Sequence, residues 1–151
     1  MITIREADLE ADALAILEAA RNSMSRINGP KFFPEDDASL VEALGRVLSL
    51  EGLHALVAEV DGEVVGGIGI HYAPYLWNPG VLAAEQVCWW AHEGAPNATA
   101  LLLIRAAFRE MRRRGAGMVT LRTLPNSSRS LDKLYRRMGL APYEMSYRGA
   151  L

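Results

Sequence analysis

Apolar residues recur at intervals of three and four along a segment in the second half of the chain. These residues are Leu101, Ile104, Phe108 and Met111, and their spacing predicts an amphipathic helix. Four arginines lie mainly on its other faces, namely Arg105, Arg109, Arg112 and Arg113. Asn97 is predicted to cap the start of the helix, and Gly115 is predicted to end it.

A segment with the residue types of a β-strand precedes this helix. It has the sequence AEQVCWWA at residues 84–91, and a loop containing Gly94 and Pro96 separates it from the helix. The first helical turn, residues 98–101, has backbone N–H groups without helical partners at the positive end of the helix dipole. This arrangement favours an anion such as a phosphate or pyrophosphate.

The remaining segments alternate between strand and helix patterns. Residues 2–5 predict a strand, Asp8 caps a following helix, residues 26–34 interrupt it, and residues 36–50 predict a second helix. Asp61-Gly62 lies between two apolar runs and predicts a β-hairpin. Residues 72–82 predict a loop, 117–124 a strand, 126–138 a helix and 142–148 a last strand. The order β-α-α-β-β-β-α-β-α-β is that of a mixed α/β domain.

Length and composition indicate one soluble domain. A chain of 151 residues can bury a core without disulfides or metal. No apolar run approaches the roughly 20 residues that a membrane span needs, and the N-terminus lacks the features of a signal peptide. We therefore expect a cytoplasmic protein without a membrane contact. Cys88 is the single cysteine, and its apolar segment predicts core packing rather than nucleophilic chemistry.

The charges are distributed unevenly along the chain. Residues 1–100 contain five Lys/Arg and 15 Asp/Glu, whereas residues 101–151 contain 11 Lys/Arg and three Asp/Glu. One interpretation is a solvated basic helix face, and the alternative is a basic region that receives an anionic ligand. The acidic remainder would repel a long polyanion, so a compact phosphorylated cofactor fits this distribution better than a nucleic acid partner does.

The order of these elements, with an aromatic-rich strand before the helix at residues 98–114, resembles the Gcn5-related N-acetyltransferases. Near the C-terminus, Tyr135, three residues, Gly139 and Leu140 resemble the family's last helix and strand. The resemblance covers nearly the whole chain and is closest to small bacterial and phage-type members. It implies a single domain over residues 1–151 with a central, mostly antiparallel twisted sheet, and acetyl transfer from acetyl-CoA to an amine.

The cofactor loop departs from the family pattern of Arg or Gln, two residues, Gly, any residue, then Gly or Ala. Alignment on Leu103 places Ala95, Ala98 and Ala100 at the three marked positions. A left-handed Ala98 would cost roughly 1–2 kcal/mol, whereas a helical conformation would cost nothing. We expect weakened rather than abolished cofactor binding, and a descendant that has lost CoA binding stays an alternative.

The resemblance implies two catalytic residues. Glu85 is the candidate base that removes a proton from the amine through water, and Tyr135 is the candidate acid that protonates the departing thiolate. The alternatives are a solvent-facing or Arg-paired Glu85 and a packing role for Tyr135. His71 is a second base candidate, although a lone histidine is more often structural. No histidines have ligand-spaced partners, so we expect no metal.

Further site residues are suggested by the resemblance, by the start of the helix and by the aromatic-rich loop. A backbone N–H near Trp89 or Trp90 is expected to polarise the thioester carbonyl. The amides of Asn97, Ala98, Thr99, Ala100 and Leu101 are expected to bind phosphates, with Arg105 or Arg129 at the adenosine 3′-phosphate. The predicted substrate-binding residues are His71, Tyr72, Tyr75 and Trp77, although these aromatics could instead cover a sheet edge or a dimer contact.

The leading hypothesis is an acetyl-CoA-dependent N-acetyltransferase that acts on a small-molecule or protein amine and forms a homodimer. The first alternative is a binding or structural protein that keeps the fold without CoA. The second is a phage-type transferase that modifies a nucleobase amine, which salt-sensitive DNA binding would support.

Overall fold

The computed structural model describes residues 1–8, 10–25, 36–123 and 129–143. These residues form five strands and four helices in the order β1-α1-α2-β2-β3-β4-α3-β5-α4. The chain divides into two compact units, which are residues 1–120 and residues 121–151. The predicted element order is confirmed up to α4, and the predicted last strand falls almost entirely outside the described residues.

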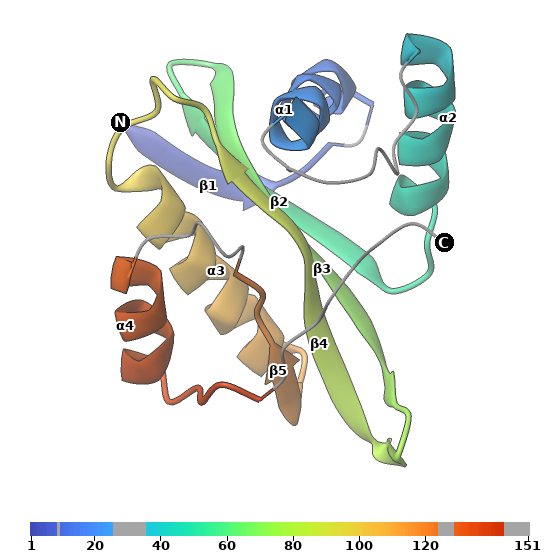
Figure 1. The fold of residues 1–151 in the computed structure, drawn as a ribbon, viewed down its shortest axis with the longest axis vertical. Coiled ribbons are helices and arrows are strands. Elements are labelled where there is room, and N and C mark those ends of the chain that lie inside the picture. Colours follow the sequence, from blue (N-terminus) through green and yellow to red (C-terminus); the bar gives the residue numbers. More distant parts are fainter. Residues whose placement is uncertain (9, 26–35, 124–128, 144–151) are drawn as a thin grey trace. The chain divides into compact units, whose positions relative to one another are not determined.

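The first unit is built on a five-stranded sheet in the order β1-β2-β3-β4-β5 (Figure 1). Its strands are β1 (Ile2–Glu6), β2 (Leu53–Val60), β3 (Glu63–Tyr75), β4 (Asn78–Ala91) and β5 (Met118–Thr120). Neighbouring strands are antiparallel except for β4 and β5, which are parallel. The prediction of a mixed α/β fold with a mostly antiparallel sheet is confirmed.

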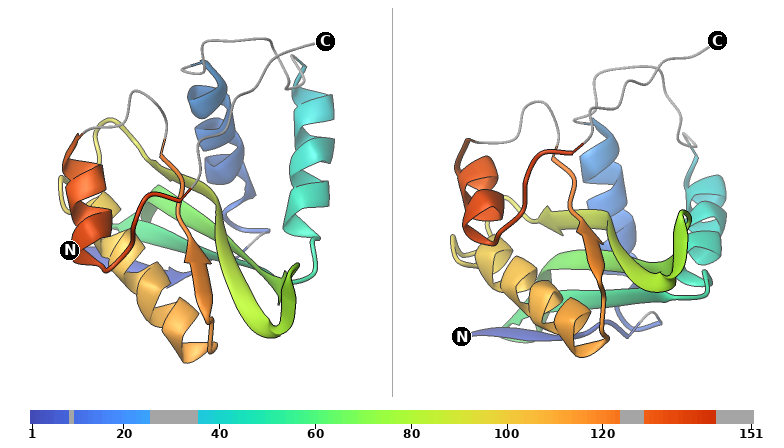
Figure 2. Two further views of the ribbon diagram at one scale, coloured as in Figure 1. Left: turned by 60° about the horizontal axis from the view of Figure 1, so that its bottom comes forward. Right: turned by 90° about the horizontal axis from the view of Figure 1, so that it is seen from below.

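The helices of the first unit lie on both faces of this sheet (Figures 1 and 2). They are α1 (Ala13–Ser25), α2 (Asp37–Leu48) and α3 (Thr99–Arg113). On one face, α3 buries Leu103, Ile104 and Met111. Ile104 and Met111 belong to the predicted apolar face, whereas the predicted Leu101 and Phe108 are only half-buried. The other face is covered by α1 and α2. The fourth helix, α4 (Arg129–Arg137), belongs to the second unit.

Two local sequence signals are confirmed by the backbone. Asp61 and Gly62 have φ angles of 52° and 88° and connect β2 to β3 in a two-residue turn, as the Asp-Gly pair predicts. Gly115 follows the end of α3 with φ of 76°, and its amide donates to the carbonyl of Arg112 at 3.0 Å. Glycine suits this left-handed position because it has no Cβ.

The predicted loop at residues 72–82 is wrong, because most of this segment belongs to the β3–β4 hairpin. Only Leu76 and Trp77 form its turn. Pro74 and Pro79 suggested a loop, but β2 begins at Leu53, opposite His71, so β3 is an edge strand beyond that point. Proline is tolerated in edge strands because a missing N–H breaks no ladder there.

Other boundaries also differ from the predictions. The strand predicted at residues 117–124 is limited to β5, residues 118–120. Asn97 does not cap α3, whose N-cap is Ala98. The predicted interruption at residues 26–34 and the predicted helix start at residues 126–128 lie outside the described residues.

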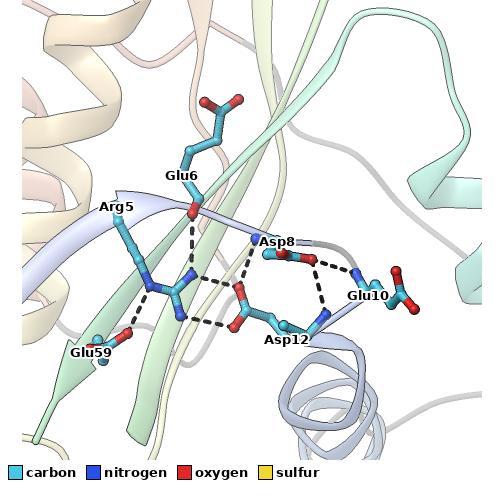
Figure 3. Close-up of polar contacts among 7 residues, drawn as sticks. Arg5, Glu6, Asp8, Glu10, Asp12 and Glu59 are labelled. Carbon is cyan, nitrogen blue, oxygen red and sulfur yellow. Dashed lines mark hydrogen bonds and ion pairs between the residues drawn. The ribbon is translucent and has the colours of Figure 1, made fainter. Parts of the chain in front are cut away.

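A buried carboxylate joins β1 to the start of α1 (Figure 3). Asp12 is 4% exposed, and its two oxygens accept from Nη1 and Nη2 of Arg5 at 2.8 and 2.9 Å. It also accepts from the amide of Asp8 at 2.9 Å. Nε of Arg5 donates to Glu59 on β2 at 2.8 Å, so one guanidinium ties two strands and a helix together. This hydrogen bonding holds the pKa of Asp12 below its usual value.

A second polar cluster fixes the C-terminal end of α3 to the sheet. Nδ1 of His54 lies 3.0 Å from Nη2 of Arg114 and 3.1 Å from a carboxylate oxygen of Glu6. Arg114 can only donate and Glu6 can only accept, so these contacts require different protonation states of Nδ1. Burial, followed by the charge of Arg114, lowers the pKa of His54. The neutral imidazole that accepts from Arg114 is therefore favoured.

This cluster predicts a pH dependence of stability. Because the pKa of His54 is lower in the folded protein than its ordinary value of 6.5, the unfolded chain takes up this proton first. The free energy of unfolding should therefore fall as the pH drops below 6.5. His54→Leu should flatten this dependence in urea unfolding at several pH values, and His92→Leu serves as the control. An unchanged slope in His54→Leu would contradict the assignment.

Candidate functional site at the divergence of β4 and β5

The parallel strands β4 and β5 pair over a short distance and then separate. Ala83, Ala84 and Glu85 lie opposite Met118, Val119 and Thr120. There β5 ends, whereas β4 continues to Ala91 with β3 as its partner strand. The chain then reaches the start of α3 through residues 92–98. The part of β4 beyond Glu85 therefore leads, through this loop, to the N-terminus of α3.

A β-bulge interrupts β4 within the diverging part. Gly69 of β3 is opposite Cys88 and Ile70 is opposite Gln86, so Val87 is an extra residue without a partner in the register. Bulges bend a strand and re-aim its side chains. Val87 and Cys88 are consequently both exposed. The predicted core packing of Cys88 holds only in part, because the residue is exposed at the bulge whereas burial raises the pKa of its thiol.

The N-terminus of α3 has no side-chain cap. Its N-cap residue Ala98 has φ of −80° and ψ of −15°, so its methyl group costs no left-handed strain. The amide of Thr99 donates to the Pro96 carbonyl at 2.9 Å. The amides of Ala98, Ala100 and Leu101 donate to no partner among the residues that the structure describes. Backbone donors of this kind at the positive end of a helix suit an anion.

Close packing holds this end of α3 against β3. Thr99 is 1% exposed, and its Oγ1 has no hydrogen-bond partner within the described part of the chain. A Cβ at Gly66 would lie 3.1 Å from Cγ2 of Thr99 and from Cδ1 of Leu103. Glycine at this position therefore permits the close approach of the helix to the strand. This packing against β3 fixes the position of the backbone amides at the start of α3.

The two tryptophans of β4 lie on opposite faces of the sheet. Trp89 is opposite Ile68 on the face covered by α3, and its buried Nε1 has no partner among the described residues. Trp90 lies over Gly67, where a Cβ would be 2.9 Å from the indole Nε1. Its ring makes an edge contact with His92 at 5.1 Å between centroids. The pair of glycines at positions 66 and 67 thus accommodates both the helix and the indole.

Glu85 and His71 share one face of the sheet. They are direct cross-strand partners in the β3–β4 register, and such partners have neighbouring side chains. Residues alternate between faces, so both lie on the face opposite α3. Nε2 of His71 is 3.1 Å from the carbonyl oxygen of Glu51. The structure thus brings together the two residues that the sequence suggested as bases.

The predicted aromatic substrate residues are dispersed. Tyr72 is buried on the α3 face, 5.1 Å below the guanidinium of Arg114, and burial raises the pKa of its hydroxyl. It therefore lies on the opposite face from His71. Trp77 is 81% exposed in the hairpin turn, next to the half-buried Tyr75. These three aromatics do not line one surface together with Glu85.

Two predicted residues belong to the second unit. Tyr135 is buried, and its hydroxyl donates to the carbonyl oxygen of Arg122 at 3.4 Å. Burial raises the pKa of Tyr135 to about 12, so the hydroxyl keeps its proton at neutral pH. Arg129 is the first residue of α4, and its side chain lies outside the described residues. Arg105, on α3, is exposed.

Sequence reasoning missed the bulge at Val87 and the roles of Gly66 and Gly67. The run GGIG at residues 66–69, inside an otherwise strong strand, was the available signal, because glycine in a strand marks a close approach. No group of three or more potential metal ligands occurs in the described part of the chain. Likewise, no helix in that part is long and apolar enough to cross a membrane.

Comparison with known proteins identifies the fold. The sequence matches no protein-family model, and a search among curated proteins finds no match either. The structure is similar to a transcriptional regulator from Bacillus halodurans C-125, with 21% identity, a TM-score of 0.77 and coverage of 100% of both chains. It is also similar to a ribosomal-protein-alanine N-acetyltransferase from Brucella melitensis biovar Abortus 2308, with 20% identity, a TM-score of 0.74 and coverage of 100% and 99%.

A third solved structure is an aminoglycoside acetyltransferase from an uncultured soil metagenomic sample, in complex with sisomicin. It is 17% identical, with a TM-score of 0.70 and coverage of 99% of this chain and 96% of that chain. Acetyltransferases of different origin thus share this fold at low sequence identity. The protein has the fold of the Gcn5-related N-acetyltransferases.

Proposed function

We propose that the protein is an N-acetyltransferase that moves an acetyl group from acetyl-CoA to an amine. The observation that carries this proposal is the uncapped N-terminus of α3, which follows the part of β4 that extends beyond its pairing with β5. Ala98 is helical, so the alanines that replace the family's glycines leave backbone donors directed at an anion site. Acetyltransferase structures of the same fold support the same reaction class.

Main-chain atoms, rather than side chains, would make most of the contacts to acetyl-CoA. The amides of Ala98, Ala100 and Leu101 would bind its phosphates, and the backbone of β4 near Trp89 would receive its acyl end. When bound, acetyl-CoA supplies an acetyl group activated as a thioester. The α3 N-terminus also supplies positive potential without a side-chain arginine, which explains how this chain can lack the Arg or Gln of the family pattern.

The acceptor must lose a proton before it can react as a nucleophile. A primary amine has a pKa of about 10.4, so it arrives as an ammonium. A carboxylate beside the site attracts this ammonium, and a base must then accept its proton. Glu85 supplies a carboxylate on the face of β4 opposite α3. In the second unit, the hydroxyl of Tyr135 keeps its proton at neutral pH, as the acid role suggested by the family resemblance requires.

Calorimetric titration with CoA tests the cofactor site. Binding of CoA but not of a non-phosphorylated pantetheine analogue is the expected result, because the proposed amides recognise phosphate. A screen of primary amines, with sisomicin among them, would then test acetyl transfer. Absence of CoA binding at millimolar concentration would overturn the proposed function.

Ala98→Asp provides a sharper test. A carboxylate at this position places a negative charge at the positive end of the helix dipole and should stabilise the helix by about 0.3–1 kcal/mol. It should also repel phosphate, so we expect at least a tenfold loss of CoA affinity in a protein that is not destabilised. Ala13→Asp, at the exposed start of α1, is the matched control and should bind CoA normally. Unchanged CoA affinity in Ala98→Asp would exclude this helix end as the phosphate site.

A further inference from the structure

The imidazole of His71 is anchored in one tautomer. Its Nε2 lies 3.1 Å from the carbonyl oxygen of Glu51. A carbonyl oxygen can only accept a hydrogen bond, so Nε2 must carry the hydrogen. The remaining nitrogen, Nδ1, therefore holds a lone pair when the ring is neutral. The anchoring group is a main-chain atom, so the tautomer depends on the fold and not on another side chain.

The orientation of the ring is also fixed. Cδ2 of His71 lies 3.7 Å from the position that a Cβ of Gly52 would occupy, so the Cδ2–Nε2 edge faces the segment that leads into β2. Nδ1 belongs to the opposite edge of the imidazole. This edge is the one that does not face Gly52 and Glu51.

The register identifies the neighbours of this ring. On the β2 side, the residue opposite His71 is the uncharged Leu53. On the β4 side, the residue opposite is Glu85, whose side chain shares the same face of the sheet. A carboxylate beside an anchored imidazole stabilises the imidazolium form, as in other base–orienter arrangements.

We propose that Nδ1 of His71 accepts the proton of the acceptor ammonium and that Glu85 stabilises the resulting imidazolium. This inference rests on the proposed acetyltransferase function and names the group that receives the proton. One N–H bond of the ammonium breaks, its electron pair stays on the amine nitrogen, and the proton bonds to Nδ1. The imidazolium later releases this proton to solvent.

Imidazole is better suited to this step than a carboxylate alone. Ordinary imidazoles have a pKa of about 6.5 and ordinary glutamates of about 4.3. A general base is most effective when its pKa lies near the operating pH. In this proposal His71 receives the proton, and Glu85 stabilises the positive charge that forms on the imidazole.

The variant His71→Gln tests the basic nitrogen of His71 separately from its hydrogen bond to the Glu51 carbonyl. The amide nitrogen of His71→Gln can still donate to the Glu51 carbonyl, but it has no basic nitrogen. With the amine found in the screen, we expect kcat to fall about 100-fold. The KM for acetyl-CoA should change little, and the acidic limb of the pH–rate profile should disappear. His92→Gln, at the end of β4, is the control and should keep the wild-type profile.

Nitrogen NMR of the histidine rings gives a readout that does not depend on turnover. His71 should show a protonated Nε2 and an unprotonated Nδ1 above neutral pH. A protonated Nδ1, or a wild-type profile in His71→Gln with CoA binding intact, would overturn this inference alone. Absence of CoA binding would overturn the proposed function and this step with it, so the two failures are distinguishable.

Discussion

Replacing Gly52 by alanine is expected to destabilise the protein by about 2–5 kcal/mol. Gly52 has φ of 81°, a left-handed conformation that costs an alanine about 1–2 kcal/mol. In addition, a Cβ at this position would lie 2.3 Å from the carbonyl oxygen of Tyr72. Main-chain atoms must move to relieve such an overlap, which typically costs about 1–3 kcal/mol. The same movement would disturb the hydrogen bond from the Tyr72 amide to the Gly52 carbonyl, now 3.0 Å long.

Urea unfolding of Gly52→Ala and Gly62→Ala would separate the two effects. Gly62 has a similar φ of 88°, but nothing lies within 4 Å of its Cβ position. Gly62→Ala should therefore show the conformational effect alone, about 1–2 kcal/mol. Equal destabilisation of the two variants would show that the sheet absorbs the overlap without loss. Because Gly52 follows Glu51, whose carbonyl anchors His71, Gly52→Ala should also weaken the tautomer preference of His71.

Signals that depend on neighbours in the sequence predicted the fold well. The period of α3, the Asp-Gly turn and the glycine after α3 each depend on a few adjacent residues. The helix predicted from residue 36 begins at Asp37, and the structure shows that Asp36 is its N-cap, with Oδ1 accepting from the amide of Ser39 at 2.8 Å. Such local preferences act in the same way in any fold, so one sequence suffices to recognise them.

Features that depend on how the strands pair could not be predicted from neighbouring residues in the sequence. The prolines of the β3–β4 hairpin favoured a loop because their tolerance depends on where β2 begins. The exposure of Cys88 depends on the bulge at Val87, which only the register reveals. Tyr72 was grouped with His71 because they are adjacent in sequence, although alternation along β3 puts them on opposite faces.

The candidate site shows the same division. Resemblance to a family suggested Glu85, His71 and the start of α3 one by one, but not which of them are neighbours. The cross-strand pairing of His71 with Glu85 and the carbonyl anchor at Glu51 are products of the sheet register. The sequence therefore suggested which groups form the candidate site, whereas their positions relative to one another required the structure.

Asp12→Ala is expected to destabilise the protein by about 3 kcal/mol, because it removes one partner of a largely buried ion pair. Arg5 would lose the bidentate acceptor that satisfies Nη1 and Nη2 and would keep Glu59 at Nε. The amide of Asp8 would lose its acceptor as well. Glu42→Gln is the matched control, because it breaks the exposed pair of Glu42 with Arg46 within α2 and should change stability by less than about 1 kcal/mol.

The acid response of an Asp12→Asn variant would show whether the charge itself is responsible. The folded protein holds the pKa of Asp12 below its ordinary value of 3.8. The corresponding stability is therefore present above pH 3.8 and is lost as the pH falls through the lower folded pKa. In urea unfolding, Asp12→Asn should lose less stability than the wild type between neutral and acidic pH. Parallel curves for the two proteins would mean that the hydrogen-bond geometry, and not the charge of Asp12, joins β1 to α1.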